Sequence, residues 1–154
     1  MDKLKIFLAA PISGFQDECK YVTYRKNVLM LISLLLDKYD VRSEIQNISE
    51  VKTYDTPEES LKKDFNEIEK SDIFLLLHPM RMQTSSLIEL GYACALKKKL
   101  LIVGKKEDLP YLVHGLVRPT YNALSIYTSE INCQLITRNN NPQTTKNNKK
   151  KKDQ

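Results

Sequence analysis

The sequence has little of what disulfide scaffolds and metal centres require. It contains three cysteines, Cys19, Cys94 and Cys133, and two histidines. The cysteines are odd in number and widely spaced, with no Cys-x-x-Cys pair and no histidine at ligand spacing, which disfavours a disulfide framework and a zinc site. Cys94 lies in an apolar helical stretch, which indicates a small core residue. We therefore expect neither a metal ion nor a cofactor.

Glycine is also scarce, with four residues in a chain of 154. The sequence contains neither Gly-x-Gly-x-x-Gly nor a Gly-Lys-Ser/Thr loop, which disfavours dinucleotide binding by a glycine-rich turn and P-loop nucleotide binding. Gly-x-Ser-x-Gly is absent as well, so no motif supports a Ser-His-Asp triad.

Long hydrophobic runs are missing too. No window approaches the ~18 uncharged apolar residues of a membrane span. The apolar run near the start, residues 6–10, is shorter than the ~7–15 residues of a signal-peptide core. The sequence therefore predicts a cytoplasmic protein with no membrane partner.

The net charge of +5 is concentrated at the carboxyl end. Residues 139–154 hold five lysines and one aspartate, a charge of +4, which leaves +1 for the preceding 138 residues. This segment has no aliphatic or aromatic residue, so we expect 139–154 to be a disordered tail and 1–138 to form a single domain. The basic charge therefore does not indicate a nucleic-acid-binding face, and no specific nucleic acid partner is expected.

Apolar runs alternate with helical patterns along the chain. Continuous apolar runs such as LKIFLAA and DIFLLLH are typical of strands buried on both faces of a sheet. Strands are expected near residues 4–10, 40–45, 72–78, 99–104 and 123–128. Helices are expected at 17–38, from Pro57 onward behind a Thr56/Glu59 capping box, at 85–98 and, with a poorer pattern, at 107–116. This alternation predicts an α/β fold with a five-stranded parallel sheet in a flavodoxin-like or Rossmann-like three-layer sandwich.

Functional sites of such sheets gather at the carboxyl ends of the strands. The first of these ends is the loop Ala10, Pro11, Ile12, Ser13 and Gly14, between a strand and a helix. Its small residues let a ligand approach the backbone, and the start of the next helix offers free N–H groups. An ordinary turn explains the same residues, so both interpretations stay open.

Glu89 is the strongest candidate for a functional residue. It falls in the first turn of the helix after the strongest strand pattern, which places its carboxyl group at the carboxyl edge of the sheet. The flanking Leu87, Ile88 and Leu90 make part of its surroundings apolar. Ser86 and Glu89 also have the spacing of a capping box, so helix capping is the competing interpretation.

Asp64 is a second carboxylate, on the preceding helix. A helix antiparallel to the strands begins at the carboxyl edge, so its first turns, Asp64 included, are expected near Glu89. A solvated aspartate on an exposed helix face is the competing interpretation. His78 ends the central strand, where a ligand would arrive, although a lone histidine is most often structural.

At these residues the sequence resembles the nucleoside 2-deoxyribosyltransferase-like superfamily, which includes nucleoside deoxyribosyltransferases, deoxynucleotide N-hydrolases and TIR-like relatives. The resemblance spans roughly residues 4–104. Glu-Leu-Gly-Tyr-Ala is its most specific piece, and the spacing of Asp64 and Asp72 supports it. The matching segments are KIFLAAPISG, KKDFNEIEKSDIFLLL and TSSLIELGYACALKKKLLIVG. The resemblance implies the strand order 2-1-3-4-5.

The resemblance also implies roles for the candidate residues. Glu89 corresponds to the family's nucleophile and Asp64 to its base-contacting aspartate, while the first loop corresponds to the lining of the sugar pocket. His78 and Ser86 are further candidates for substrate binding. A carboxylate can attack an anomeric carbon through an oxocarbenium-like transition state. A second group must protonate the departing base, and Asp64 suits this role if burial raises its pKa.

The expected function is therefore cleavage or transfer at the N-glycosidic bond of a (deoxy)nucleoside or nucleotide, through a covalent glycosyl-Glu89 intermediate. Two alternatives are a TIR-like NAD glycohydrolase and a catalytically silent nucleotide-binding sensor. The intact Glu89 and Asp64 favour the enzymes over the sensor. The resemblance also implies a homo-oligomer.

One feature departs from the family's pattern. Deoxynucleotide hydrolases of the family carry a basic residue in the first loop to hold phosphate, and this chain has none between Ala9 and Asp17. Arg25 and Arg81 are the candidates to replace it. The missing basic residue therefore disfavours a substrate with a 5′-phosphate, unless one of these arginines replaces it.

Overall fold

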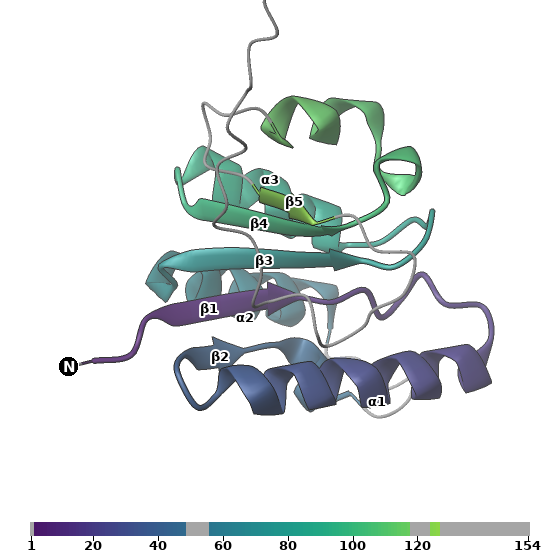
Figure 1. Cartoon of the computed structure of the whole chain (residues 1–154), viewed down its shortest axis with the longest axis horizontal. Coiled ribbons are helices and arrows are strands. Elements are labelled where there is room, and N and C mark those ends of the chain that lie inside the picture. Colours follow the sequence, from purple (N-terminus) through teal and green to yellow (C-terminus); the bar gives the residue numbers. More distant parts are fainter. Residues whose placement is uncertain (1, 49–55, 118–123, 127–154) are drawn as a thin grey trace, which may run out of the picture.

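The computed structural model describes residues 2–48, 56–117 and 124–126. They form a parallel sheet in the order β2-β1-β3-β4-β5 (Figure 1). The strands are β1 (Lys5–Ala9), β2 (Asp40–Arg42), β3 (Ile73–His78), β4 (Lys99–Gly104) and β5 (Leu124–Ile126). The α-helices are α1 (Glu18–Leu35), α2 (Pro57–Lys70) and α3 (Ser86–Ala95), and the 3-10 helices are η1 (Glu44–Gln46), η2 (Lys106–Asp108) and η3 (Tyr111–Val117).

The predicted α/β fold with a parallel sheet is confirmed, with the order β2-β1-β3-β4 for its first four strands. The longest pairing joins β3 to β4, from Ile73 opposite Lys99 to His78 opposite Gly104, so both strands end at one edge of the sheet. At the fifth position the described part holds only three residues beside β4, instead of the full strand predicted for 123–128. The predicted tail, 139–154, lies outside the described residues.

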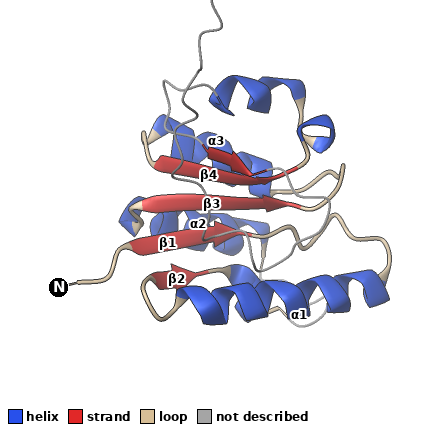
Figure 2. Ribbon diagram, viewed as in Figure 1, coloured by secondary structure: helices blue, strands red, loops and turns tan. Residues whose placement is uncertain are grey.

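Helices cover both faces of the sheet, as the colouring of Figure 2 makes plain. Side chains alternate along β1: Ile6 and Leu8 belong to the core beneath α1, while Phe7 and Ala9 belong to the core beneath α2 and α3. This alternation is the two-residue period of a strand buried on both sides. The result is a three-layer sandwich in which α1 covers one face and α2 and α3 share the other (Figure 1).

The helix starts follow from local sequence. The capping box predicted at α2 is present, with the Thr56 hydroxyl accepting from the Glu59 backbone N–H and Pro57 in the first helical turn. Asp17 caps α1 by accepting from the backbone N–H groups of Cys19 and Lys20. No helix in the described part is long and apolar enough to cross a membrane.

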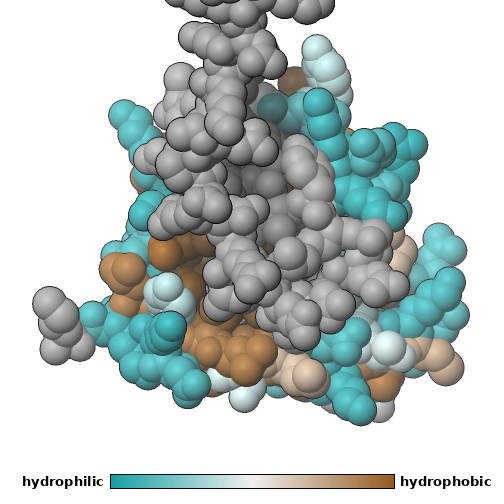
Figure 3. Space-filling view, viewed as in Figure 1, coloured by the Kyte–Doolittle hydropathy of each residue, from teal (hydrophilic) through white to brown (hydrophobic). Residues whose placement is uncertain are grey.

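Several apolar side chains on the helices are not buried. On α2, Ile68 is buried and Phe65 is half-buried, stacked on Tyr92, but Leu61 is 45% exposed. On α1, Val22, Met30, Leu34 and Leu36 are exposed, and Figure 3 shows hydrophobic side chains reaching the surface along this helix.

Two predicted elements end differently, and each has a physical reason. The strand predicted over 40–45 stops at Arg42, and the chain turns into η1 because Ile45 is fully buried and the Arg25 guanidinium bonds the carbonyls of Ile45 and Gln46. The helical pattern over 107–116 becomes the two 3-10 helices η2 and η3, separated by Pro110, which lacks the backbone N–H that a continuous helix needs.

Candidate active site

Two carboxyl groups from the neighbouring helices α2 and α3 meet on the face of the sheet that these helices cover. Asp64 lies in the second turn of α2, and Glu89 lies in the first turn of α3, just after the loop that leaves β3. The helices α2 and α3 pack against each other, and the carboxyl groups of Asp64 and Glu89 share a hydrogen bond. The structure therefore brings together the two residues for which the family resemblance implies catalytic roles.

The capping-box interpretation of Glu89 is wrong. Ser85, not Ser86, is the N-cap of α3, and its side chain makes no capping hydrogen bond. Ser86 is already helical and buried, with its backbone N–H donated to the Thr84 hydroxyl. Because Ser86 lies inside the helix, its hydroxyl is not placed to cap the backbone of Glu89, and the Glu89 carboxyl group instead faces Asp64.

Burial and like charges raise the pKa of both carboxyl groups. Burial is the main cause for Glu89, which is 9% exposed, and the nearby Asp64 and Glu44 carboxylates add to it, raising the pKa of Glu89 to about 8. The pKa of Asp64 rises to about 6, again through burial first and Glu44 second, while Lys63 and the hydrogen bond with Glu89 oppose the rise. Two carboxylates in contact inside a protein do not both ionise easily.

One proton is therefore shared by this pair near neutral pH. Because the pKa of both carboxyl groups is raised, this proton lies in the hydrogen bond between Glu89 and Asp64. Asp64 Oδ1 is buried and has no hydrogen-bond partner among the described residues. An unpaired buried polar atom is costly, and a hydrogen-bonding group on a ligand would satisfy it.

A third carboxylate, Glu44, stands beside the pair. It belongs to η1, and Lys63 of α2 holds it in an ion pair with Nζ–Oε1 at 2.9 Å and Nζ–Oε2 at 3.2 Å. Sequence reasoning missed Glu44 because the strand pattern was extended to residue 45, which placed it inside a strand. Its position just after β2, at the carboxyl edge of the sheet, was the signal that could have found it. The described residues contain no group of His, Cys, Asp or Glu arranged to hold a metal ion.

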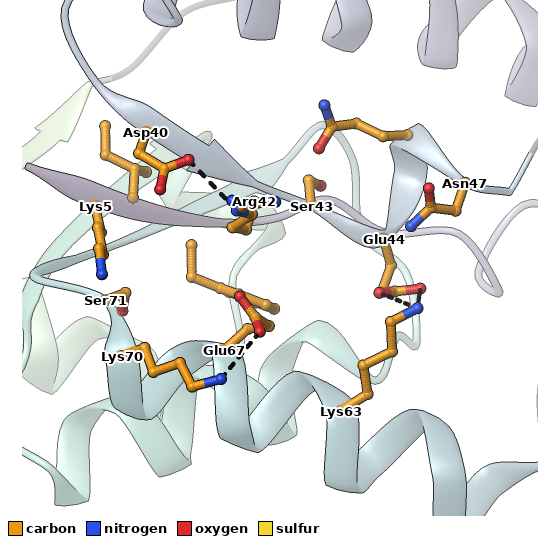
Figure 4. Close-up of a pocket in the computed structure, with 13 residues that line it drawn as sticks. Lys5, Asp40, Arg42, Ser43, Glu44, Asn47, Lys63, Glu67, Lys70 and Ser71 are labelled. Atoms are coloured by element: carbon orange, nitrogen blue, oxygen red, sulfur yellow. Dashed lines mark hydrogen bonds and ion pairs between the residues drawn. The ribbon is translucent and has the colours of Figure 1, made fainter. Parts of the chain in front are cut away.

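The Glu44–Lys63 pair lies at one end of a groove of about 560 Å³ between β2 and α2 (Figure 4). Two further ion pairs, Arg42–Asp40 and Lys70–Glu67, line the rest of it. In Figure 4 the Glu44 and Lys63 side chains point toward each other across the gap between η1 and α2. Asp64 and Glu89 do not line this groove.

The first loop divides into a buried and an open part. Ala10 and Pro11 are buried, Ile12 is half-buried, and Ser13 is exposed. Gly14 lies so close to the next loop that a Cβ atom there would stand 2.7 Å from the Gln83 carbonyl oxygen. Only glycine therefore allows the first loop to lie this close to the loop after β3.

A second groove, of about 660 Å³, lies between these two loops. Its lining includes Ser13 and Gly14 of the predicted loop, together with the cations Lys20 and Arg81. Ala10, Pro11 and Ile12 do not line it. Of the two arginines that sequence analysis left open, Arg25 is engaged with backbone carbonyls of η1, whereas Arg81 faces this groove.

His78 and Ser86 are both buried. His78 Nε2 lies 3.2 Å from the Asp108 carbonyl oxygen, and its Nδ1 has no partner among the described residues. Burial lowers the pKa of His78, so the ring is neutral at physiological pH. Its polar contact is with η2, away from Asp64 and Glu89, and no polar contact joins Ser86 to either carboxyl group in the described part.

Comparison with known proteins gives a likeness of structure only. No family model matches the chain, and no curated protein sequence matches it. The structure of Clostridium botulinum CMP N-glycosidase, BcmB, matches 82% of this chain and 91% of its own, with a TM-score of 0.62 and 23% identity. The solution structure of BlsM matches 82% of each chain, with a TM-score of 0.63 and 23% identity. This likeness shows that the chain shares their fold.

Proposed function

We propose that this protein is an enzyme of the nucleoside 2-deoxyribosyltransferase-like superfamily that breaks the N-glycosidic bond of a nucleoside or nucleotide. The observation that carries the proposal is the buried Asp64–Glu89 pair, which holds one proton between two carboxyl groups. One proton and one carboxylate are what this reaction needs: an acid for the departing base and a nucleophile for the sugar. The sequence resemblance and the fold shared with a CMP N-glycosidase support the same reaction.

In the proposed first step, the Glu89 carboxylate attacks C1′ while the bond from C1′ to the base nitrogen breaks. For Glu89 to attack as a carboxylate, the shared proton must lie on Asp64. A base that accepts a hydrogen bond from the protonated Asp64 Oδ1 stabilises this form and draws the proton to Asp64. Asp64 then protonates the base as it leaves, and the sugar stays esterified to Glu89.

In the proposed second step, a water molecule or a second base attacks C1′ and releases Glu89. Asp64, now ionised, accepts the proton that the incoming group loses, in the reverse of its first role. Attack by water gives hydrolysis and attack by a base gives transfer. Both outcomes use the same two residues, so they differ only in what reaches C1′.

Arg81 supports a nucleotide substrate. Arg81 lies in the groove beside Ser13 and Gly14, where a cation would meet a 5′-phosphate. Its guanidinium forms no ion pair with another described residue. We expect Arg81→Gln to weaken kcat/KM for a nucleoside 5′-monophosphate by roughly tenfold or more, as the loss of a charge-assisted hydrogen bond does. The same variant should leave the matching nucleoside unchanged. Equal effects on both substrates would contradict a phosphate contact at Arg81.

The proposed function is tested by base release. The protein is incubated with a panel of nucleosides, nucleoside monophosphates and NAD, and free base is measured by chromatography. Release from at least one nucleoside or nucleotide, accelerated by an added second base if transfer operates, supports the proposal. Release from NAD alone would assign the site to a glycohydrolase of the TIR type. Failure to release base from any of them would overturn the proposal.

A further inference from the structure

Phe65 and Tyr92 form an aromatic stack between α2 and α3. Their ring centroids are 3.9 Å apart and the ring planes are 9° from parallel, so the two side chains meet face to face. The Tyr92 hydroxyl also donates a hydrogen bond of 2.5 Å to Oε1 of Glu69, which lies one turn after Phe65 on α2. This length is typical of a hydrogen bond to an ionised carboxylate. Two side chains of α2 therefore hold one ring of α3.

The stack lies next to the proposed catalytic pair on both helices. Phe65 directly follows Asp64 on α2. On α3, Tyr92 comes three residues after Glu89, which places both side chains on the same face of that helix. Three residues correspond to a rise of about 4.5 Å along a helix. The ring contact and the carboxyl contact are therefore consecutive contacts between the same two helices.

A third contact joins the other ends of these helices. Lys98, in the turn between α3 and β4, donates hydrogen bonds from Nζ to the backbone carbonyls of Glu69 and Ser71, each at 2.7 Å. From the start of the two helices toward their ends, the contacts are thus carboxyl to carboxyl, ring to ring and amine to carbonyl. The ring contact lies between the other two, and it is the one that follows the carboxyl pair directly.

We propose that Phe65 and Tyr92 are positioning residues for the carboxyl pair. Contact between the rings sets the smallest distance to which α2 and α3 can approach, because stacked rings cannot interpenetrate. The hydrogen bond from Tyr92 to Glu69 sets the largest distance, because a hydrogen bond weakens steeply when its atoms separate. Together they fix the helix separation at which the Asp64 and Glu89 carboxyl groups meet. The inference rests on the proposed function for its catalytic meaning, but the helix geometry is independent of any substrate.

A hydrogen bond between two carboxyl groups tolerates little displacement. Its oxygen atoms lie about 2.5–3.0 Å apart, so a movement of one helix by ~1 Å breaks it. A reacting group that is misplaced by this distance loses roughly 10²-fold in rate. Phe65 carries no charge, and the hydrogen bond to Glu69 raises the pKa of Tyr92, which keeps its phenol neutral. The stack therefore acts on the carboxyl pair through distance, and neither ring needs to touch the substrate.

Three variants separate the two parts of this arrangement. Tyr92→Phe keeps the ring and loses the hydrogen bond to Glu69. Phe65→Leu keeps an apolar side chain and loses one face of the stack, whereas Tyr92→Leu loses both the stacked ring and the hydroxyl. Lys98→Met is the matched control, because it removes the contact at the other end of the two helices and leaves the stack intact.

The experiment follows the carboxyl carbons of Asp64 and Glu89 by NMR during a pH titration of the substrate-free protein. Burial raises the pKa of both groups in the wild type. Water enters between helices that separate, so the titration midpoints should fall toward their ordinary values. We expect a fall of roughly one pH unit for Glu89 in Tyr92→Leu, and smaller falls in Tyr92→Phe and Phe65→Leu.

The control decides whether the effect belongs to the stack. Glu44 and Lys63, whose charges act on the carboxyl pair, are the same in every variant, so a changed midpoint reports a change of position. Lys98→Met should lower the melting temperature and leave both midpoints where they are in the wild type. Unchanged or higher midpoints in Tyr92→Leu would overturn the inference. Equal falls in Tyr92→Leu and Lys98→Met would overturn it too, because they would mean a general loosening of the helices.

Activity adds a second readout where base release is found. In Tyr92→Leu kcat should fall by roughly 10²-fold with KM nearly unchanged, and Tyr92→Phe should recover most of the loss. If the wild type releases no base from any substrate, the proposed function fails, and the titration still decides this inference by itself. If Tyr92→Leu does not fold, judged by circular dichroism, Tyr92→Phe and Phe65→Leu are compared with Lys98→Met by the same criterion.

Discussion

Two charged regions lie along the same helix, α2, and they differ in burial. The Asp64–Glu89 pair is enclosed between α2 and α3. The groove side of α2 carries Lys70–Glu67, opposite Arg42–Asp40 on β2, and the side chains of these ion pairs are between 32% and 64% exposed. Both regions are rich in carboxylates, and in the first of them burial raises the pKa of both acids.

The difference shows what turns a carboxylate into a candidate acid or nucleophile. In the groove each acid has a cation beside it and water within reach. Between α2 and α3 the two acids face each other, with Glu89 buried and Asp64 half-buried, so burial and the neighbouring carboxylate both disfavour the charged form. Perturbed acids of this kind are typical of functional sites, and the comparison therefore favours the buried pair as the site.

The strongest test of the comparison is Glu89→Gln. The amide keeps the shape of the protonated carboxyl but cannot attack C1′, so base release should fall by ~10³-fold or more. The measurement is base release by the folded variant with a substrate that the wild type accepts. Undiminished release would remove Glu89 from the proposed mechanism.

Asp64→Asn should have the next largest effect, a loss of roughly 10²–10⁴-fold with a natural nucleoside, because the departing base is no longer protonated. The loss should be much smaller with a synthetic glycoside whose leaving group, such as p-nitrophenolate, departs without a proton. Glu89→Gln should not be rescued by that substrate. An equal loss of both substrates in Asp64→Asn would contradict the role of Asp64 as an acid.

The buried pair should also make stability depend on pH. The folded protein keeps protons on Asp64 and Glu89 at pH values where the unfolded chain, with ordinary pKa values of 3.8 and 4.5, has lost them. Folded carboxyl groups with a raised pKa lower the free energy of unfolding as the pH rises through this window, from about 4 to about 8. His78, whose pKa is lowered, opposes this slope below pH 6.5.

Glu89→Gln isolates that contribution, since the amide never ionises. We expect the variant to melt several degrees above the wild type at pH 8 and to approach it at pH 5. Thermal unfolding across this pH range measures the difference. A constant difference at all pH values would mean that Glu89 titrates normally in the folded protein.

The smallest effect is expected in the groove. Glu67→Gln removes an exposed ion pair, so the free energy of unfolding should change by less than about 0.5 kcal/mol, and base release should not change. Chemical denaturation and the base-release assay measure the two quantities. A large loss of activity in Glu67→Gln would mean that the exposed groove also contributes to the reaction, and would contradict the contrast drawn between the two sides of α2.

Much of the architecture could be predicted from the chain alone. Apolar runs such as IFLLLH in β3 have one structural solution in a protein of this size, a strand covered on both faces, and Thr56, Pro57 and Glu59 fix the start of α2 through local hydrogen bonds. Less predictable were the ends of elements. The strand β2 ends early, at Arg42, because the guanidinium of Arg25 on α1 binds the carbonyl groups of the residues in η1 that follow.

The sequence by itself determined the alternation of strands and helices, and it placed Asp64 and Glu89 at the same edge of the sheet, because hydrophobic period and capping are local properties. Only the tertiary structure excluded the capping-box interpretation of Glu89. Whether its carboxyl group caps a helix or faces another acid depends on which serine is the N-cap and on how α2 packs against α3. Glu44 and Lys63 were likewise beyond the sequence, because residues 19 positions apart meet only when η1 folds back against α2.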